Sequence, residues 1–409
     1  MDTIIKSKGI YDGDTCRIVT DRALLISGEY ISDIGKPVDL CEKYPNASVI
    51  DWSSQYLFPG LINTHVHLEF DGSNHARKRW IEESEGTRFL LSASNTTTLI
   101  HSGVTSVRDA GSSWGLLDLK RPYVRQLQPL PLIKFAGPPL TVTGGHLSFL
   151  GNGCETDSCE DMIRQVRIRK KKGCDAVKLI VTGGQMTPGS IPEHTYMSVA
   201  EISAACSEAH NQNLPVFAHC LTTEGFTSCI KGGVDCIEHV ACFKRNDENG
   251  LLERVYEPEK MRMADNKHIY FMMGLSAGYH NLDDFRDGVK ASSPREIFLL
   301  EQEEKMFQIF KKCIEIGMTP VCGTDAGTPG TRFDETWLEL VLMVERAGLK
   351  PEEAIRIGTV NSAKCLGIQT GELKKGYLAD MITVTENPLC NIRALKNVEH
   401  IICQGSIVR

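Results

Sequence analysis

The chain has 409 residues, of which 41% are hydrophobic and 24% charged, and its formal net charge at pH 7 is −7. This length allows a large buried core, and the composition is that of an ordinary soluble protein. The charge lacks the basic surplus that a nucleic-acid backbone requires, and no apolar stretch of the sequence is long enough to span a bilayer. We therefore expect neither a nucleic-acid partner nor a membrane partner.

The N-terminus and the cysteines favour a cytoplasmic location. Residues 1–8 lack the long apolar region of a signal peptide. The fifteen cysteines are scattered, form no Cys-x-x-Cys pair, and in several places, such as Cys174, Cys236 and Cys322, lie inside apolar runs. Buried free thiols in a reducing compartment explain this usage better than a disulfide framework does.

Both ends of the chain have the pattern of short strands separated by turns. The strand-like pieces are 22–27, 30–35, 380–384 and 400–408. Gly28 supplies the turn between the first two pieces. We expect residues 1–58 and 366–409 to pair into one small β-sandwich domain, with the rest of the chain inserted between them.

The middle of the chain, 59–365, alternates short apolar strands with helical stretches, of which 198–210 and 301–316 are examples. The candidate strands lie near 60–66, 104–108, 132–136, 175–180, 215–219, 234–239, 269–273 and 319–324. Eight strand–helix units in this length predict an α/β fold, a (β/α)8 TIM barrel, whose active site lies at the C-terminal ends of the strands.

A His-x-His pair lies at the end of the first predicted barrel strand. His65 and His67 flank a single residue, and side chains at i and i+2 of a strand face the same side, so the two can bind one metal ion together. Such a pair is a weak signal alone. The preceding run, residues 58–64, strengthens the interpretation of the pair as metal ligands.

Lys178 lies in the fourth predicted strand, inside the apolar run 175–180. A cation in a buried strand is costly unless it is paired, so one interpretation is a salt bridge to a neighbouring carboxylate. The other is that its neutral amine captures carbon dioxide and becomes an anionic carbamate, which can bridge two metal ions. Desolvation and nearby metal charge disfavour the ammonium form, as that reaction requires. Both interpretations stay open at this point.

Three further residues fall at the ends of predicted strands. His219 ends the fifth strand, His239 ends the sixth, and Asp325 follows the eighth in a glycine-rich turn. Each one alone has an ordinary explanation, as a buried core histidine or a turn aspartate. Their order along the chain, together with the His-x-His pair and the lysine, is how a parallel barrel would hold two metal ions over one substrate. The sequence therefore predicts a metal-dependent hydrolase.

The chain resembles the amidohydrolase superfamily almost from end to end. Residues 59–67 resemble its first-strand signature, and residues 371–381 resemble the terminal segment that returns to the small sandwich. Residues 178–189 and 233–239 are similar to the imidazolonepropionase-like group, which includes prolidase-type dipeptidases.

This resemblance implies two divalent metal ions, with Zn²⁺ the best fit to nitrogen and oxygen ligands and manganese or cobalt as substitutes. His65, His67 and Asp325 would hold the more buried ion, and His219 and His239 the more exposed one. Asp325 would also act as the catalytic proton shuttle, taking a proton as hydroxide attacks and delivering it to the leaving amine.

The resemblance also implies that Lys178 carries a carbamate derived from carbon dioxide and that a water molecule or hydroxide bridges the two ions with it. The ions would lower the pKa of that water and polarise the scissile carbonyl.

Three residues are candidates for contact with the substrate. The resemblance implies a catalytic and substrate-binding role for His146, in Gly144-Gly145-His146 after the third strand, and a turn histidine is the alternative. Tyr196, in the loop after the fourth strand, is a candidate for binding a substrate carboxylate. Arg332, beyond Asp325, is another candidate, with a surface salt bridge as its alternative.

The function that these residues predict is hydrolysis of an amide in a small molecule, such as a dipeptide or an N-acyl amino acid. Hydrolysis of a cyclic amide or lactone is the alternative, because the same binuclear centre can serve it. A deaminase fits less well, since mononuclear deaminases of the superfamily carry His-x-x-Glu after the fifth strand and this chain has Thr222 there. A non-catalytic relative is disfavoured because all six candidate ligands are present. Besides the small-molecule substrate, we expect only copies of the chain as partners, in a homo-oligomer.

Overall fold

The structure is a computed structural model that describes residues 2–151, 154–264, 268–283 and 293–409. All eight strands predicted for the middle of the chain occur. They are β6 (Leu61–Val66), β7 (Val104–Asp109), β8 (Leu132–Phe135), β9 (Val177–Ile180), β10 (Val216–Cys220), β11 (Cys236–His239), β14 (Tyr270–Met272) and β15 (Thr319–Pro320). They pair in parallel, in the orders β6-β7-β8 and β9-β10-β11-β14-β15.

Backbone hydrogen bonds connect these two groups of strands at both ends. Leu140, just after β8, accepts from the amide of Ile180 and donates to the carbonyl of Lys178, each at 2.8 Å. On the other side, the amide of His67 donates to Ala326 at 2.8 Å, and Val66 and Ala326 form a parallel bridge. The hydrogen bonding therefore passes through all eight strands in one continuous order.

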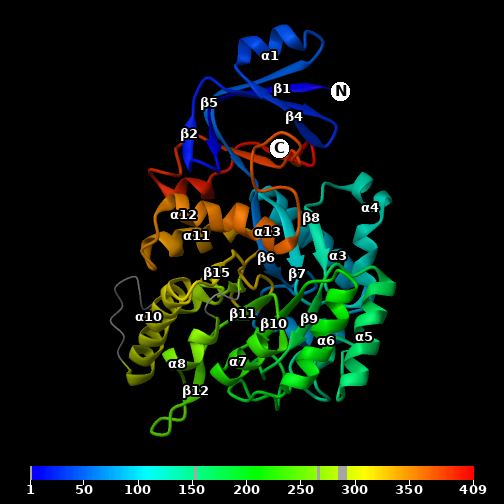
Figure 1. The fold of residues 1–409 in the computed structure, drawn as a ribbon, viewed down its shortest axis with the longest axis vertical. Coiled ribbons are helices and arrows are strands. Elements are labelled where there is room, and N and C mark those ends of the chain that lie inside the picture. Colours follow the sequence, from blue (N-terminus) through cyan, green and yellow to red (C-terminus); the bar gives the residue numbers. More distant parts are fainter. Residues whose placement is uncertain (1, 152–153, 265–267, 284–292) are drawn as a thin grey trace.

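Helices pack beside these strands and follow them in sequence (Figure 1). The longer ones are α3 (Glu85–His101), α5 (Cys159–Lys172), α6 (Val199–Asn211), α7 (Thr223–Gly232), α10 (Pro294–Glu315) and α11 (Thr336–Glu345). The shorter ones are α1 (Pro37–Lys43), α2 (Ala76–Glu82), α4 (Pro122–Leu127), α8 (Pro258–Met261), α12 (Pro351–Arg356) and α13 (Ser362–Leu366), the last preceded by a π-helical turn at Ile357–Asn361. Every residue of β6, β7, β9 and β10 is buried, including the polar side chains that these strands carry among their apolar ones.

The two predicted helices are confirmed, with one shifted boundary. Helix α6 begins after Ser198, which forms a capping box with Glu201. Helix α10 begins at Pro294, seven residues before the predicted start at 301, because Ser293 and Glu296 form a second capping box upstream of the apolar repeat. Between β11 and β14 the chain forms a short antiparallel hairpin, β12 (Phe243–Arg245) and β13 (Leu252–Arg254). Short 3-10 helices lie at Trp114–Lys120, Ser148–Leu150, Arg262–Ala264, Tyr279–Leu282 and Ile392–Lys396.

The two chain ends form one sheet, drawn in blue and red at the same end of the molecule in Figure 1. Its strand order is β18-β17-β16-β5-β1-β3-β4, with β2 beside β1. The strands are β1 (Thr3–Asp12), β2 (Arg17–Val19), β3 (Ala23–Ser27), β4 (Tyr30–Gly35), β5 (Ser48–Pro59), β16 (Met381–Val384), β17 (Ile401–Cys403) and β18 (Ser406–Ile407). All four predicted terminal pieces thus contain strands, and Gly28 turns the first hairpin at φ 60°.

This terminal sheet encloses its own apolar cluster. Ile5, Leu24 and Ile31 from the N-terminal strands pack with Met381 and Ile402 from the C-terminal ones. The segment 376–379 hydrogen-bonds to β4 on one side, and on the other side Ala379 accepts from the amide of Gly405. The two distant ends of the chain therefore share one core.

Two expectations drawn from composition can be compared with the structure. All fifteen cysteines are free thiols and most of them are buried, as expected. Among the described residues, the helices include none with the length and hydropathy needed to cross a membrane.

Candidate metal centre

Five histidine rings follow one another in a row at the C-terminal side of the parallel strands. The ring centres of His67 and His65 lie 5.3 Å apart, those of His65 and His239 5.0 Å, those of His239 and His219 4.9 Å, and those of His219 and His146 4.8 Å. The sequence brings these rings together from β6, β10, β11 and the loop after β8. The structure thus gathers every predicted histidine in one place.

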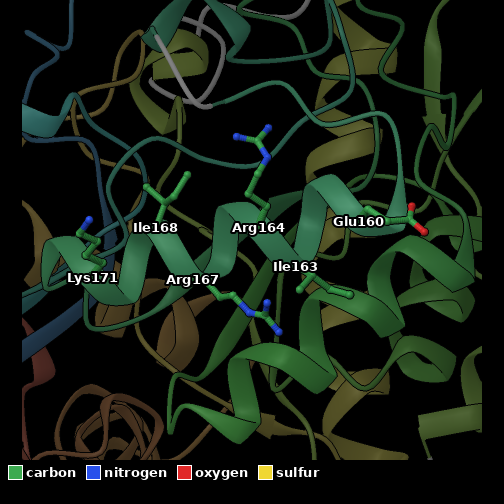
Figure 2. Close-up of a pocket in the computed structure, with 6 residues that line it drawn as sticks. All are labelled: Glu160, Ile163, Arg164, Arg167, Ile168 and Lys171. Atoms are coloured by element: carbon green, nitrogen blue, oxygen red, sulfur yellow. The ribbon is translucent and has the colours of Figure 1, made fainter.

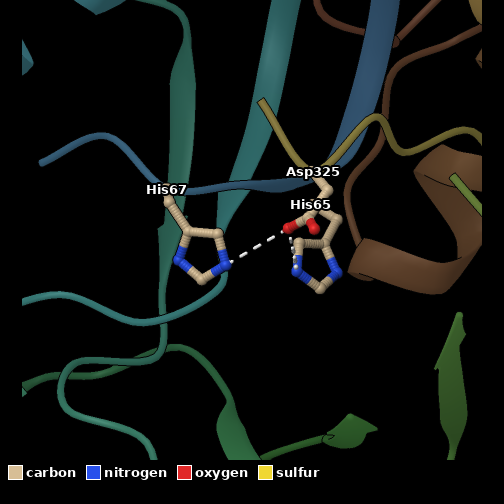
Figure 3. Close-up of side chains that lie close together, drawn as sticks. All are labelled: His65, His67 and Asp325. Carbon is tan, nitrogen blue, oxygen red and sulfur yellow. Dashed lines mark ion pairs between the residues drawn. The ribbon is translucent and has the colours of Figure 1, made fainter. Parts of the chain in front are cut away.

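Asp325 lies against the first two of these rings. Figure 3 shows both imidazoles directed at its carboxylate. Its Oδ1 is 3.2 Å from Nε2 of His65 and 3.3 Å from Nε2 of His67. One ligand atom from each of the three residues lies within 4.8 Å of the others, a spacing that one metal ion could bridge.

The partner of each Nδ1 atom fixes the orientation of these two rings. Nδ1 of His65 contacts the carboxylate of Glu238, and Nδ1 of His67 lies 3.3 Å from the carbonyl oxygen of Gly111. Because both partners accept hydrogen bonds, each Nδ1 carries the proton and each Nε2 presents a lone pair toward Asp325. Metal-binding histidines are typically held in this way.

Glu238 and Arg108 are two residues whose role sequence reasoning missed. Nη2 of Arg108, on β7, donates to Glu238 at 2.8 Å, and its Nε donates to the carbonyl of Thr64 at 2.8 Å. Burial alone would raise the pKa of Glu238, but Arg108 and His65 outweigh burial and hold it well below its usual range. Glu238 therefore stays ionised between an arginine and a candidate ligand. The signal in the sequence was a charged residue inside each of two apolar strands.

Lys178 is 1% exposed, and its Nζ has no hydrogen-bond partner among the described residues. Within the same part of the chain no carboxylate lies within 4.0 Å of that nitrogen, so the salt bridge considered as its alternative is not formed. Burial lowers the pKa of Lys178 to about 8, although Glu238 acts to raise it. Lys178 is the second residue of β9 rather than its last, and its long side chain spans the difference.

His219 and His239 complete the row of rings. Nε2 of His219 lies 3.0 Å from the carbonyl of Gly183, which leaves Nδ1 of that ring as the free lone pair. Burial holds the pKa of His219 well below its usual value and lowers that of His239 to about 3, so both rings are neutral at pH 7, as metal ligands must be.

Two of the candidate ligands have unusual backbone conformations. His239 has φ 73° and Asp325 has φ 62°, in the left-handed region that non-glycine residues seldom occupy. Such strain concentrates at functional sites, where the surrounding structure holds it in place.

The donor atoms of this cluster fit a metal site. Among the described residues, the buried polar atoms without a hydrogen-bond partner include Nε2 of His65, Oδ1 of Asp325 and Nζ of Lys178. Leaving such atoms unpartnered is costly, and a bound cation would relieve that cost for the imidazole nitrogen of His65 and the carboxylate oxygen of Asp325. Imidazole nitrogen and carboxylate oxygen are among the ligands that bind zinc and other divalent metals in proteins.

The cluster opens into a cavity of about 1090 Å³. All six candidate ligands line it, and so does His146, whose ring lies where a Cβ atom on Gly184 would approach it to 2.5 Å. Nδ1 of His146 is buried and unpartnered among the described residues. Position 184, the second of the two glycines that follow β9, therefore requires glycine, because a larger residue would collide with this ring.

Tyr196 and Arg332 are the two predicted substrate residues that the structure does not bring to the cavity. The hydroxyl of Tyr196 accepts from the amide of Ile191 at 3.3 Å. Arg332 forms the surface ion pair considered as its alternative, with Asp334 at 2.7 Å. A substrate-binding role for either residue stays a prediction.

A second hollow lies along α5, and Figure 2 shows the side chains of that helix that line it. Ile163, Arg164 and Arg167 contribute to its lining. Both arginines are already paired, Arg164 with Asp161 at 3.0 Å and Arg167 with Glu208 at 2.9 Å. The hollow contains none of the candidate ligands, so the chemistry belongs to the larger cavity.

The fold and the histidine–carboxylate cluster define a class of hydrolase, and comparison with known proteins identifies the family. The model of the amidohydrolase family matches residues 56–408, and the chain belongs to that family. It is accordingly an enzyme that hydrolyses carbon–nitrogen bonds.

Individual relatives are similar over most of their length. The ochratoxinase of Aspergillus niger is 28% identical over 97% of this chain and 84% of its own. The 5-methylthioadenosine/S-adenosylhomocysteine deaminase of Pyrococcus furiosus is 24% identical over 93% of this chain and 86% of its own. The crystal structure of a Xaa-Pro dipeptidase with methionine bound in its active site superposes with a TM-score of 0.84 at 26% identity, covering 100% of this chain and 99% of that one. The predicted resemblance to prolidase-type amidohydrolases is confirmed.

Proposed function

We propose that this protein is a binuclear, zinc-dependent amidohydrolase that cleaves the amide bond of a small substrate such as a dipeptide or an N-acyl amino acid. The observation that carries the proposal is the convergence of His65, His67 and Asp325 on one point, in a row of rings that continues through His239 and His219. The similarity to a Xaa-Pro dipeptidase supports an amide of this kind.

Each ligand in the proposal has a place in the cluster. His65, His67 and Asp325 hold one ion, and His219 and His239 hold the second. When bound, the two ions lower the pKa of a water molecule and polarise the scissile carbonyl. Asp325 takes the proton from the attacking water and returns it to the leaving nitrogen. Its side chain is 18% exposed and lines the cavity, where it can meet both groups.

His146 completes the set of reacting residues in this proposal. Its unpartnered Nδ1 and its position beside His219 support a hydrogen bond or close contact with the substrate carbonyl. The substrate carbonyl would then be held between the metal centre and an imidazole.

We further propose that Lys178 carries a carbamate, formed when its neutral amine adds to carbon dioxide and releases one proton. The lowered pKa and the unpartnered Nζ support this reaction. In enzyme loaded with zinc and ¹³C-bicarbonate, NMR should show one carbamate carbon that is missing from Lys178→Met. An unmodified ammonium group in crystals grown with zinc and bicarbonate would contradict the assignment.

The fold behind this site is proposed to be a (β/α)8 barrel, residues 59–365, joined to a small β-sandwich formed by residues 1–58 and 366–409. The continuous order of the parallel strands supports the barrel. The shared apolar cluster of the two chain ends supports the smaller domain.

Hydrolysis of a cyclic amide or lactone remains the second candidate on the same centre. Deamination is a weaker one, although a deaminase is among the relatives. Thr222 occupies the position where such deaminases carry a glutamate, and here its hydroxyl caps α7 by accepting from Gly225 at 2.9 Å. That residue therefore serves the helix rather than the chemistry.

The first test is elemental analysis of the purified protein together with hydrolysis of a panel of dipeptides and N-acyl amino acids. About two equivalents of zinc, as expected of a co-catalytic pair, with cleavage of some members would support the proposal. Two metals without cleavage would favour cyclic amides or lactones. No metal, even after refolding with zinc and bicarbonate, would contradict the ligand assignment. Asp325→Asn should lower kcat by about 10²- to 10⁴-fold while much of the substrate binding remains.

A further inference from the structure

The large cavity is lined by several basic side chains besides the candidate ligands. Three of its arginines are Arg77, Arg245 and Arg254. Arg245 is neutralised by an ion pair with Glu193, and Arg77 lies over the ring of Phe149. These three residues therefore present different amounts of free positive charge to a substrate.

Arg254 is held in place by contacts from neighbouring segments. It lies on β13 opposite Phe243 of β12, and its guanidinium carbon is 4.8 Å from the centre of that ring. Nη1 donates to the carbonyl of Ala241 at 3.2 Å, and the backbone amide donates to Gln302 at 2.6 Å. A guanidinium held on two sides loses little freedom when it binds an anion.

The charge of Arg254 has no counter-ion within the described part of the chain. No carboxylate there lies within 4.0 Å of its guanidinium, and neither Nε nor Nη2 donates a hydrogen bond to a described residue. Burial lowers the pKa of Arg254 to about 10, so the group is still charged at pH 7. A partly buried cation without a counter-ion favours an anionic ligand.

Arg254 is also close to the metal cluster. Its partner Ala241 is two residues beyond His239, and consecutive Cα atoms are about 3.8 Å apart, so the Cα atoms of Ala241 and His239 are separated by at most about 7.6 Å. Arg254 and the candidate ligands line the same cavity, so a substrate held at the cluster can extend toward the guanidinium.

We infer that Arg254 binds a carboxylate of the substrate and that the enzyme acts on anionic amides, namely N-acyl amino acids or peptides with a free C-terminal carboxylate, in preference to neutral amides. The inference rests on the proposed hydrolysis and adds the charge of its substrate. Apolar side chains also line parts of the cavity, beside the polar ones, and they can contact an apolar side chain on the residue that bears the carboxylate. They include Leu221, Phe243, Met273, Leu275, Phe298 and Met306.

The experiment compares two ligands that differ only in charge and need no turnover. The first is 2-benzyl-4-oxopentanoate, in which a methylene replaces the amide nitrogen of N-acetylphenylalanine, and the second is its carboxamide. Calorimetry on the zinc-loaded full-length protein measures the ratio of their dissociation constants. A charge-assisted hydrogen bond predicts a carboxylate preference of about 10- to 100-fold in the unmodified enzyme.

Variants then locate the source of that preference. Arg254→Met should reduce the ratio to about one, and Arg254→Lys should retain part of it. Arg245→Met is the matched control, because Arg245 lies on the same hairpin and lines the same cavity but is paired with Glu193, so the ratio should persist. A ratio measured on one preparation does not depend on the fraction of folded protein.

The outcomes separate this inference from the proposed function. Equal binding of the two ligands by the unmodified enzyme, or an unchanged ratio in Arg254→Met, would overturn the role of Arg254 even if amides are hydrolysed. If Arg254→Met loses the preference for the carboxylate ligand and Arg245→Met keeps it, the carboxylate site is established even if no amide in the panel is cleaved.

Discussion

At the scale of single residues, the candidate metal ligands depend on partners that lie outside the lining of the cavity. His65 is held by Glu238, and Glu238 is held by Arg108, so one chain of contacts runs through β6, β11 and β7. All three side chains are at most 2% exposed. In such a setting, removing one charge leaves the next one buried without compensation, and that is more costly than losing a surface ion pair.

Glu238→Gln tests this chain of contacts. It should lower the free energy of unfolding by about 3–5 kcal/mol, because the buried guanidinium of Arg108 loses its counter-ion. It should also lower the zinc content, since the single oxygen of the glutamine amide can accept from Arg108 or from His65 but not from both, and the ring of His65 is then held less firmly. Urea denaturation and elemental analysis measure the two effects.

The matched control is Glu193→Gln, which breaks a partly exposed ion pair with Arg245. Its cost should be below about 1 kcal/mol, with the zinc content unchanged. Similar losses in the two variants would show that the buried chain of charges has no special part in holding the site.

The residues of the candidate site could be selected from the sequence, and their supporting partners could not. His65, His67, Lys178, His219 and Asp325 each occur in a local pattern, an apolar run with a polar residue at or near its end. The contact between Arg108 and Glu238 joins residues 130 positions apart, and no local pattern specifies it. Arg254 was missed for the same reason, since its place in the cavity depends on how the β12–β13 hairpin folds back.

At the scale of elements, a buried carboxylate on one helix positions a loop of the cavity. Glu339 on α11 accepts hydrogen bonds from the amides of Leu275 and Ser276, both at 2.8 Å. The loop after β14 lines the cavity through Leu275 and its neighbours. Burial raises the pKa of Glu339 from 4.5 to about 7, although these hydrogen bonds act to lower it.

This raised pKa predicts a stability that depends on pH. Between about pH 4.5 and 7 the folded state retains a proton at Glu339 that the unfolded state has lost, so the free energy of unfolding falls as pH rises through this window. The free energy of unfolding of the wild type, relative to that of Glu339→Gln, should therefore rise by on the order of 3 kcal/mol as pH falls from about 8 to 4.

Urea denaturation of both proteins across this range, with a chelator present throughout, measures the difference without interference from metal binding. A difference that stays constant with pH would contradict the role assigned to this carboxyl group.

The sequence predicts where helices and strands begin and end less accurately than it predicts that they exist. All eight predicted parallel strands exist, because strands buried on both faces are rich in apolar residues and most of these stand out as short apolar runs. The last strand ends at Pro320 rather than at 324, although Val321 and Cys322 still hydrogen-bond to their neighbours. Helix α10 extends upstream of its apolar repeat because a capping box, rather than hydrophobicity, determines where it begins.

At the scale of the whole molecule, the site joins segments that are far apart in the sequence. The candidate ligands come from β6, β9, β10 and β11 and from the turn after β15, so ions bound there would connect strands from both hydrogen-bonded groups. The unfolded chain has no such preformed site. Metal ions that bind the folded state but not the unfolded state therefore add their binding free energy to the stability of the fold.

Removal of metal should therefore destabilise the entire molecule, not only the cavity. With free zinc at 100 to 1,000 times the dissociation constant, the zinc-loaded protein should exceed the chelated one by about 3–4 kcal/mol in the free energy of unfolding. His65→Ala should lose most of this difference, because one metal position loses a ligand. His210→Ala is the control, since His210 lies at the surface beside Asp235, and it should keep the difference in full. Equal stability of the wild-type protein with and without chelator would mean that the row of histidines does not bind metal in the folded state.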